Sequence, residues 1–128
     1  MTRVADAIFQ RLNFETDVCF FVPGGSSMFL VDALGRSKLR HVSALHEQGA
    51  GAMALGYAMA SGRLGVCCTI SGPGATNAIT PCLAAWNDSV PVLFISGQAR
   101  TETLGGGDDL RTHGLQPCDI VPIMKPIT

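Results

Sequence analysis

The sequence HEQGAGAMALGYA at residues 46–58 places one carboxylate, that of Glu47, at the start of a predicted helix rich in small residues. Three glycines, Gly49, Gly51 and Gly56, lie within this helix. Each glycine inside a helix costs about 1 kcal/mol relative to alanine. A helix that carries three of them indicates that another backbone, or a flat ligand, approaches its surface closely.

The carboxylate of Glu47 has two interpretations. An acidic residue in the first turn of a helix is favoured by the helix dipole and needs no further function. However, residues 42–45 are predicted to form a strand that ends directly before this helix. Open α/β sheets bind their ligands at the carboxyl ends of the strands, so Glu47 is also a candidate site residue.

Apolar runs alternate with helical patterns along the rest of the chain. Predicted strands cover residues 18–22, 40–45, 65–70 and 91–96. Predicted helices cover residues 2–13, a segment that begins at a serine cap and ends at Gly35, and residues 46–61, 73–86 and 118–124. Strands without polar alternation, separated by helices, indicate a parallel sheet covered on both faces. We therefore predict an α/β fold of three layers, α-β-α, with a mostly parallel central sheet.

The composition excludes several classes of protein. The 128 residues suit one domain, with 47% hydrophobic residues, 15% charged residues and a net charge of −1. A net charge this close to zero does not favour binding to nucleic acid or to an anionic membrane. The N-terminus lacks the central apolar run of a signal peptide, and no stretch is long enough to span a membrane. Five cysteines without a C-x-x-C pair predict buried, reduced thiols in a cytoplasmic protein and no metal site.

Two general hypotheses for the glycine-rich turns rest on incomplete motifs. The turn Gly72-x-Gly74 before a predicted helix suggests a phosphate site, but Asn77 replaces the third glycine of a dinucleotide fingerprint and no Walker lysine follows. A nucleophilic serine is the second hypothesis. None of the serines at the strand ends lies in a G-x-S-x-G motif.

Six blocks of sequence follow one another in a specific order. They are Val22-Pro23-Gly24-Gly25, His46-Glu47-Gln48-Gly49-Ala50, Gly56-Tyr57-Ala58, Ser71-Gly72-Pro73-Gly74-Ala75-Thr76-Asn77, Asp88-Ser89-x-Pro91 and Gly97-Gln98. Together they resemble the N-terminal, pyrimidine-binding domain of thiamine-diphosphate-dependent enzymes, and acetolactate synthases (acetohydroxyacid synthases) in particular. The resemblance covers essentially the whole chain, residues 1–128, and implies the thiamine-diphosphate-binding fold.

The resemblance implies a catalytic role for Glu47. In that family the matching glutamate hydrogen-bonds N1′ of the aminopyrimidine ring and favours its 4′-imino tautomer. The imine then removes the proton from C2 of the thiazolium ring, and the resulting ylide attacks a 2-keto acid. Decarboxylation and carboligation to a second carbonyl follow. The cofactor supplies the electron sink, while the protein supplies position and one acid–base group.

The same resemblance implies a set of cofactor-binding residues in addition to Glu47. They are Val22, Gly24, Gly25, Pro73, Asn77 and Gln116. Gln116 matches the glutamine of a Phe-Gln-Glu block, which here reads Leu115-Gln116-Pro117. Because the chain departs from the family pattern at this point, acetolactate does not follow as the product.

The resemblance also implies that a second domain is missing. Family members bind the diphosphate and Mg²⁺ through a Gly-Asp-Gly motif with a downstream asparagine, and the active site lies between two chains. Gly107-Asp108-Asp109 is not that motif. We therefore expect a fragment or a subunit, inactive alone, that needs a second copy or a partner chain, most simply in a homo-oligomer. The alternatives are a non-catalytic assembly module of the same fold and another 2-keto acid decarboxylase.

Overall fold

The computed structural model describes residues 2–104, 111 and 114–128. At its centre is a four-stranded sheet of order β2-β1-β3-β4 in which all neighbouring strands are parallel. The strands are β1 (Val18–Phe21), β2 (Arg40–Ser43), β3 (Gly65–Thr69) and β4 (Val92–Ser96). The register pairs Val18 with Arg40 and Gly65 with Val92. The prediction of a parallel α/β sheet is confirmed.

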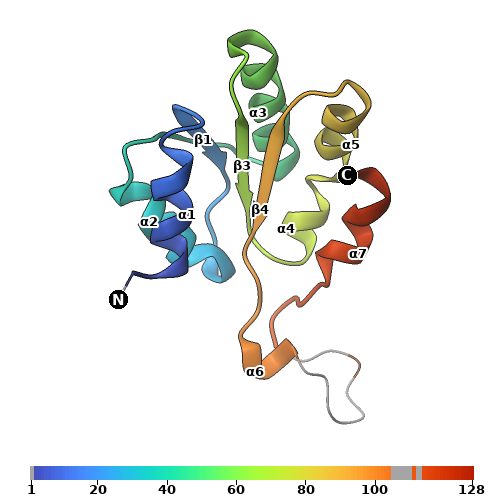
Figure 1. Cartoon of the computed structure of the whole chain (residues 1–128). Helices are drawn as coiled ribbons and strands as arrows, with labels where there is room; N and C mark the ends of the chain where they lie inside the picture. Colours follow the sequence, from blue (N-terminus) through green and yellow to red (C-terminus); the bar gives the residue numbers. More distant parts are fainter. Residues whose placement is uncertain (1, 105–110, 112–113) are drawn as a thin grey trace.

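Helices cover both faces of the sheet (Figure 1). On one face, α1 (Val4–Leu12) packs against α2 (Met28–Arg36). On the other, α3 (Glu47–Ser61) packs against β3, β1 and α5 (Ile79–Asn87). The remaining short elements are η1 (Gly25–Ser27), α4 (Pro73–Thr76), α6 (Thr101–Leu104), α7 (Ile120–Met124) and η2 (Lys125–Ile127). The three predicted layers are therefore present.

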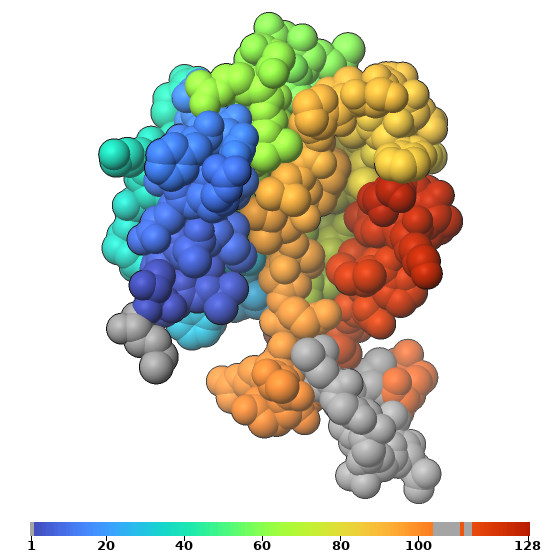
Figure 2. All heavy atoms as spheres, in the orientation of Figure 1, coloured from blue at the N-terminus to red at the C-terminus, as the bar shows by residue number. Residues whose placement is uncertain are grey.

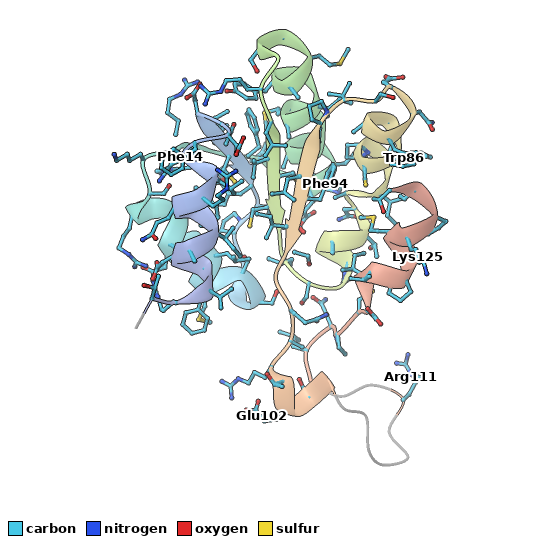
Figure 3. All side chains as sticks on the ribbon, viewed as in Figure 1. Phe14, Trp86, Phe94, Glu102, Arg111 and Lys125 are labelled. Atoms are coloured by element: carbon cyan, nitrogen blue, oxygen red, sulfur yellow. The ribbon has the colours of Figure 1, made fainter. Side chains whose placement is uncertain are left out.

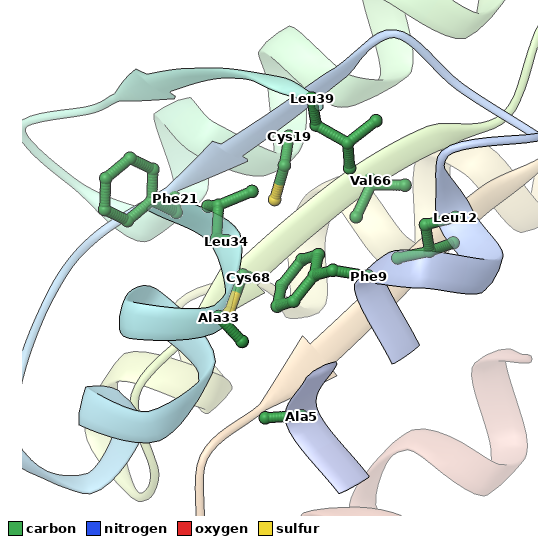
Figure 4. Packing of buried hydrophobic residues seen from close by; sticks show 10 residues of the cluster. All are labelled: Ala5, Phe9, Leu12, Cys19, Phe21, Ala33, Leu34, Leu39, Val66 and Cys68. Atoms are coloured by element: carbon green, nitrogen blue, oxygen red, sulfur yellow. The ribbon is translucent and has the colours of Figure 1, made fainter. Parts of the chain in front are cut away.

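The two inner strands contribute to a separate core on each face, because successive side chains of a strand point to opposite sides. The core beneath α1 and α2 consists of Ala5, Phe9, Leu12, Cys19, Phe21, Ala33, Leu34, Leu39, Val66 and Cys68 (Figure 4). The core beneath α3 consists of Val18, Phe20, Ala50, Ala54 and Cys67. A fully buried side chain such as Phe9 contributes about 1.5–3 kcal/mol to folding, so each face is held by several such residues.

All five cysteines are free thiols, and four of them are buried. Burial raises the pKa of Cys68 to about 12. Burial, followed by the nearby ionisable groups, raises the pKa of Cys67 to about 12 as well, and burial also raises the pKa of Cys19. These thiols therefore stay protonated and unreactive at neutral pH. The prediction of buried, reduced cysteines in the strands is confirmed.

The end of α2 differs from the prediction. The helix passes Gly35 and ends at Arg36, so the predicted stop at Gly35 is wrong. Arg36 forms an ion pair with Asp32 one turn earlier and a second with Asp6 of α1. Ser37 then closes the helix, since its hydroxyl donates a hydrogen bond of 2.7 Å to the carbonyl of Leu34.

The predicted serine cap at the start of α2 is also wrong. Ser27 occupies the N-cap position but makes no side-chain capping bond. Its hydroxyl instead donates backward to the carbonyl of Gly24 at 3.1 Å. The turn η1 precedes the helix, and this hydrogen bond holds the turn rather than the helix start.

The predicted helix over residues 73–86 is divided into α4 and α5. The amide of Ala78 donates to the carbonyl of Ala75, three residues back, which tightens the chain after α4. Pro81 has no amide hydrogen with which to bond the carbonyl of Asn77, so a continuous helix would lose a hydrogen bond here. The predicted strand over 40–45 ends early at Ser43, and the predicted helix over 118–124 begins at Ile120.

Both edge strands of the sheet lie at the surface. All four residues of β2 are exposed, and Figure 2 shows β4 at the surface between α1 and α7. An apolar cavity of about 990 Å³ lies beside β4, lined in part by Trp86 of α5, Phe94 of β4 and Met124 of α7; Figure 3 labels the first two. None of the helices in the described part of the chain combines the length and apolar character needed to cross a bilayer.

Candidate functional site

The carboxyl ends of the four parallel strands meet at one edge of the sheet, where backbone hydrogen bonds connect the turns that follow them. The amide of Ser71, after β3, donates to the hydroxyl of Ser26, after β1, at 2.9 Å. The amide of Gly97, after β4, donates to the carbonyl of Thr69 at 3.0 Å. A Cβ on Gly97 would lie under 3.0 Å from the carbonyl of Ser26, so glycine permits this close approach. The turns therefore form one connected scaffold.

Glu47 is the first residue of α3 and is only 7% exposed. Small residues allow α3 to lie close against the sheet: Ala50 and Ala54 are completely buried, and a Cβ on Gly51 would overlap Pro81 of α5. As a result, the start of the helix lies over the carboxyl edge rather than beyond it. The carboxylate is withdrawn from solvent by the packing of the whole helix.

One amide group hydrogen-bonds the carboxylate of Glu47. The side-chain Nδ2 of Asn77, at the end of α4, donates to Oε2 at 2.9 Å. The second oxygen, Oε1, has no hydrogen-bond partner among the residues that the structure describes. A Cβ on Gly74 would lie 2.9 Å from Oε1. Glycine at position 74 therefore adds no side chain beside an oxygen that has no described hydrogen-bond partner.

Ile70 links the glycines of two different turns. Its Cγ2 lies 2.5 Å from the position that a Cβ on Gly24 would take, and its Cγ1 lies under 3.0 Å from the corresponding position on Gly74. Gly24 follows β1 and Gly74 lies in α4. The Ile70 side chain therefore packs against the backbone of both turns, and of the two glycines it is Gly74 that lies beside Oε1 of Glu47.

The charge of Glu47 has no counter-ion in the described part of the chain: none of the ion pairs found there includes it. Its field nevertheless reaches the strand beneath. Burial is the main cause of the raised pKa of Cys67, and the charges of Cys68 and Glu47 contribute further. A buried carboxylate without a described basic partner is a candidate for a hydrogen bond to a ligand.

The other residues predicted from the sequence lie around this centre. Val22 directly follows β1, is half-buried and donates its amide to Cys68 at 3.2 Å. Gly25 begins η1 with open space around it, and Pro73 begins α4 with its ring exposed.

Gln116 reaches the edge through its backbone. A Cβ on Gly72 would overlap its carbonyl oxygen, and both residues have positive φ, +62° for Gly72 and +50° for Gln116. The structure thus brings Glu47, Asn77 and Gly24 together and places Gln116 against Gly72. Gly107-Asp108-Asp109 lies outside the described residues.

Three contributors to this geometry were not identified from the sequence. The imidazole Nδ1 of His46 accepts a hydrogen bond of 3.2 Å from the amide of Gln48. The predicted helix over 46–61 included His46, whereas α3 begins at Glu47 and His46 is its N-cap; a side-chain acceptor is favoured at that position. Gly74 was visible as the second glycine of Gly-Pro-Gly. Ile70 gave no signal, because its contacts join segments that are distant in sequence.

Comparison with known families identifies the scaffold. The family described as "Thiamine pyrophosphate enzyme, N-terminal TPP binding domain" matches residues 2–123. The chain belongs to this family. Thiamine pyrophosphate is the same compound as thiamine diphosphate, so the resemblance derived from the six blocks is confirmed.

The similar proteins are acetolactate synthases. The chain is 47% identical over 126 residues to the acetolactate synthase of Mycobacterium leprae, a match that covers 97% of this chain and 19% of that protein. It is 45% identical, with the same coverage, to the acetolactate synthase large subunit of Corynebacterium glutamicum. It is 42% identical over 127 residues to the mitochondrial catalytic subunit of Saccharomyces cerevisiae, which it covers to 17%. The chain therefore spans about a fifth of the length of these relatives.

Proposed function

We propose that this chain is the N-terminal, pyrimidine-binding domain of a thiamine-diphosphate-dependent, acetolactate synthase-like enzyme, in which Glu47 is the catalytic acid–base residue. The observation that carries the proposal is the state of its carboxylate. One oxygen is held by Asn77 at 2.9 Å, and the other is buried without a described partner beside Gly74. Family membership and the names of the relatives support the assignment.

The described residues fit an aminopyrimidine ring. Such a ring is flat, needs a hydrogen-bonding partner for a ring nitrogen, and requires surroundings without projecting side chains. Glu47 offers an oxygen without a described hydrogen-bond partner, and Gly74 adds no side chain beside that oxygen. We propose that Val22, Gly25, Pro73 and Asn77 complete the walls around the ring, with Gln116 on the substrate side.

When bound, thiamine diphosphate would supply the electron sink for decarboxylation of a 2-keto acid and for transfer of the remaining fragment to a second carbonyl. The chain's own residues contribute position and one proton. Glu47 would hold a proton between Oε1 and the ring nitrogen, and the low polarity around it would strengthen this hydrogen bond. Asn77 would keep Oε2 occupied, so that the carboxylate presents one oxygen in one orientation.

We propose that the diphosphate and Mg²⁺ are bound by a second domain, carried by a longer form of this polypeptide or by a partner chain. The length of the relatives supports this, since the chain matches only 19% of the first of them. A second copy of the chain in a homo-oligomer would complete the active site. The isolated 128 residues should then bind the cofactor weakly and show no turnover. Reduced thiols throughout the chain support a cytoplasmic location.

Glu47→Gln tests the proposal in the enzyme that carries both domains. Glutamine preserves the shape and one hydrogen bond but cannot share a proton with the ring nitrogen. Loss of general acid–base catalysis typically costs about 10²–10⁴-fold in rate, so proton exchange at C2 of the bound cofactor, followed by NMR, should slow by that factor. Stability against urea should change little.

Glu15→Gln is the matched control, because Glu15 precedes β1 and therefore lies at the opposite edge of the sheet. It should exchange C2 at the parent rate. If Glu47→Gln also exchanges at the parent rate, Glu47 is only a first-turn carboxylate and the chain is better described as a non-catalytic assembly module. The departure from the family pattern around Gln116 leaves the product open. Analysis of the products formed from single 2-keto acids would distinguish an acetolactate synthase from another 2-keto acid decarboxylase.

A further inference from the structure

The start of α3 is held by an imidazole ring. His46 has an extended backbone, φ −154° and ψ 145°, and its Nδ1 accepts the amide hydrogen of Gln48 at 3.2 Å. The first amides of a helix have no partner within the helix, and His46 satisfies one of them. The carbonyl of His46 accepts the first helical hydrogen bond, from Ala50 at 3.0 Å. His46 therefore closes the first turn from both its backbone and its side chain.

The connection before His46 offers little other support. The amide of Ala44 donates to Phe21 at 2.8 Å, which is the last described backbone bond between this connection and the sheet. Leu45 is fully exposed at 105% and packs against nothing described. Between Ala44 and the first turn of α3, the hydrogen bond from the Gln48 amide to the His46 ring is thus the side-chain contact, among the described residues, that fixes the path of the backbone.

An acceptor at Nδ1 determines the chemical state of the ring. Nδ1 accepts through its lone pair, so the tautomer that makes this cap carries its ring hydrogen on Nε2. A protonated ring, or the tautomer with hydrogen on Nδ1, would place two hydrogens against each other at this position.

We propose that His46 is a positioning residue for Glu47: through Nδ1 it caps α3 and fixes the backbone from which the carboxylate projects. The inference rests on the proposed role of Glu47. The carboxylate has a single described partner, Asn77, which itself ends a helix of only four residues. Fraying of the first turn of α3 would therefore move Glu47 away from Asn77 while the rest of the helix stays packed on the sheet.

The test uses three variants of the full chain. His46→Ala removes the cap, His46→Asn retains one through its side-chain oxygen, and Gln48→Ala, the matched control, preserves the capped amide while changing the neighbouring side chain. Long-range ¹H–¹⁵N NMR of the unmodified chain should show Nδ1 unprotonated and Nε2 protonated. Exchange of the Gln48 amide should be about fivefold faster in His46→Ala, the factor that a typical cap contributes.

The functional readout is C2 proton exchange in the two-domain enzyme. It should slow about fivefold in His46→Ala and stay within about twofold of the parent rate in His46→Asn and Gln48→Ala. A proton on Nδ1, or unchanged Gln48 exchange in His46→Ala, would overturn the cap and leave the proposed function untouched. Equal slowing in His46→Ala and His46→Asn would overturn positioning in favour of a direct role of the imidazole. Glu47→Gln with parent-rate exchange would instead refute the proposed function, whatever the state of His46.

Discussion

Gly74→Ala should disturb the candidate site through one added methyl group. The new Cβ would lie 2.9 Å from Oε1 of Glu47 and under 3.0 Å from Cγ1 of Ile70. Ile70 also packs against the turn after β1, since its Cγ2 lies 2.5 Å from the place where a Cβ on Gly24 would stand. The methyl group therefore meets a side chain that already contacts a second turn.

Two opposing effects set the magnitude. Replacing glycine by alanine inside a helix gains about 1 kcal/mol, and Gly74 lies within α4. Overpacking a well-filled position costs about 1–3 kcal/mol. We expect the second effect to be larger, so that Gly74→Ala lowers the free energy of unfolding by about 1 kcal/mol and shifts the carboxylate of Glu47.

Urea unfolding of the 128-residue chain measures this change through the transition midpoint at constant m-value. The decisive comparison is the same substitution in an Ile70→Ala background, where the contacting side chain is gone. There Gly74→Ala should be neutral or stabilising, which gives a coupling free energy of about 1–2 kcal/mol, within the range for residues in contact. Additive effects of the two substitutions would refute the steric reasoning.

Gly56→Ala provides the control for helix propensity, because nothing lies within 4 Å of a Cβ on Gly56. It should raise the free energy of unfolding by up to about 1 kcal/mol. If Gly56→Ala and Gly74→Ala stabilise the chain equally, the contact between Gly74 and Ile70 does not restrict this position.

Two further predictions concern the surface and the core. Gly56→Gln should leave the isolated chain folded but reduce the size of the assembled enzyme in sedimentation experiments, because we propose that the exposed face of α3 contacts a partner; unchanged assembly counts against that surface. Folding should also weaken at high pH, because burial raises the pKa of Cys67 and Cys68 from 9.0 to about 12. Below pH 9 both states are protonated; above it only the unfolded thiols ionise, so each thiol lowers the free energy of unfolding by about 1.4 kcal/mol per pH unit up to about pH 12. In urea titrations, Cys68→Ala should reduce the fall of the unfolding free energy with pH, and Cys118→Ala should not. Equal pH dependence in the parent chain and both variants would contradict the raised pKa of the buried Cys68.

The sequence predicted the sheet well because its signals are local. The strands β1, β3 and β4 are short apolar runs that end at a glycine or a polar turn, whereas β2 (Arg40–Ser43) is mostly polar; each parallel pair needs an intervening helix. The errors at Gly35 and in the helix after Pro73 have a different origin. Ion pairs of Arg36 with Asp32 and Asp6 hold one helix past its glycine, and the missing amide hydrogen of Pro81 divides the other. Only the second of these could have been inferred from local sequence.

For the candidate site, the sequence supplied the residues but not their contacts. Glu47 and Asn77 could be placed at one edge from strand order, since parallel strands end together. That Asn77 binds one oxygen and leaves the other beside Gly74 depends on how α4 ends, and no periodic pattern encodes it. Ile70 could not be found at all, because its role arises only when two distant turns close on it.

From the sequence, all three glycines of α3 were explained by a close approach of another group to the helix surface. In the structure, these glycines lie on two different faces of the helix. Gly51 faces inward, where a Cβ would overlap Pro81, and Gly65 on β3 lies so close to the helix that its Cβ would overlap the carbonyl of Ala54. These inward glycines bring α3 onto the sheet and so place Glu47 over its edge. In the part of the chain that the structure describes, nothing lies within 4 Å of a Cβ on Gly49 or Gly56, so packing among those residues does not explain why these positions are glycine. A smooth outer face that the described residues leave uncovered is the feature that an approaching second chain would require, and it belongs to the same helix that presents the carboxylate.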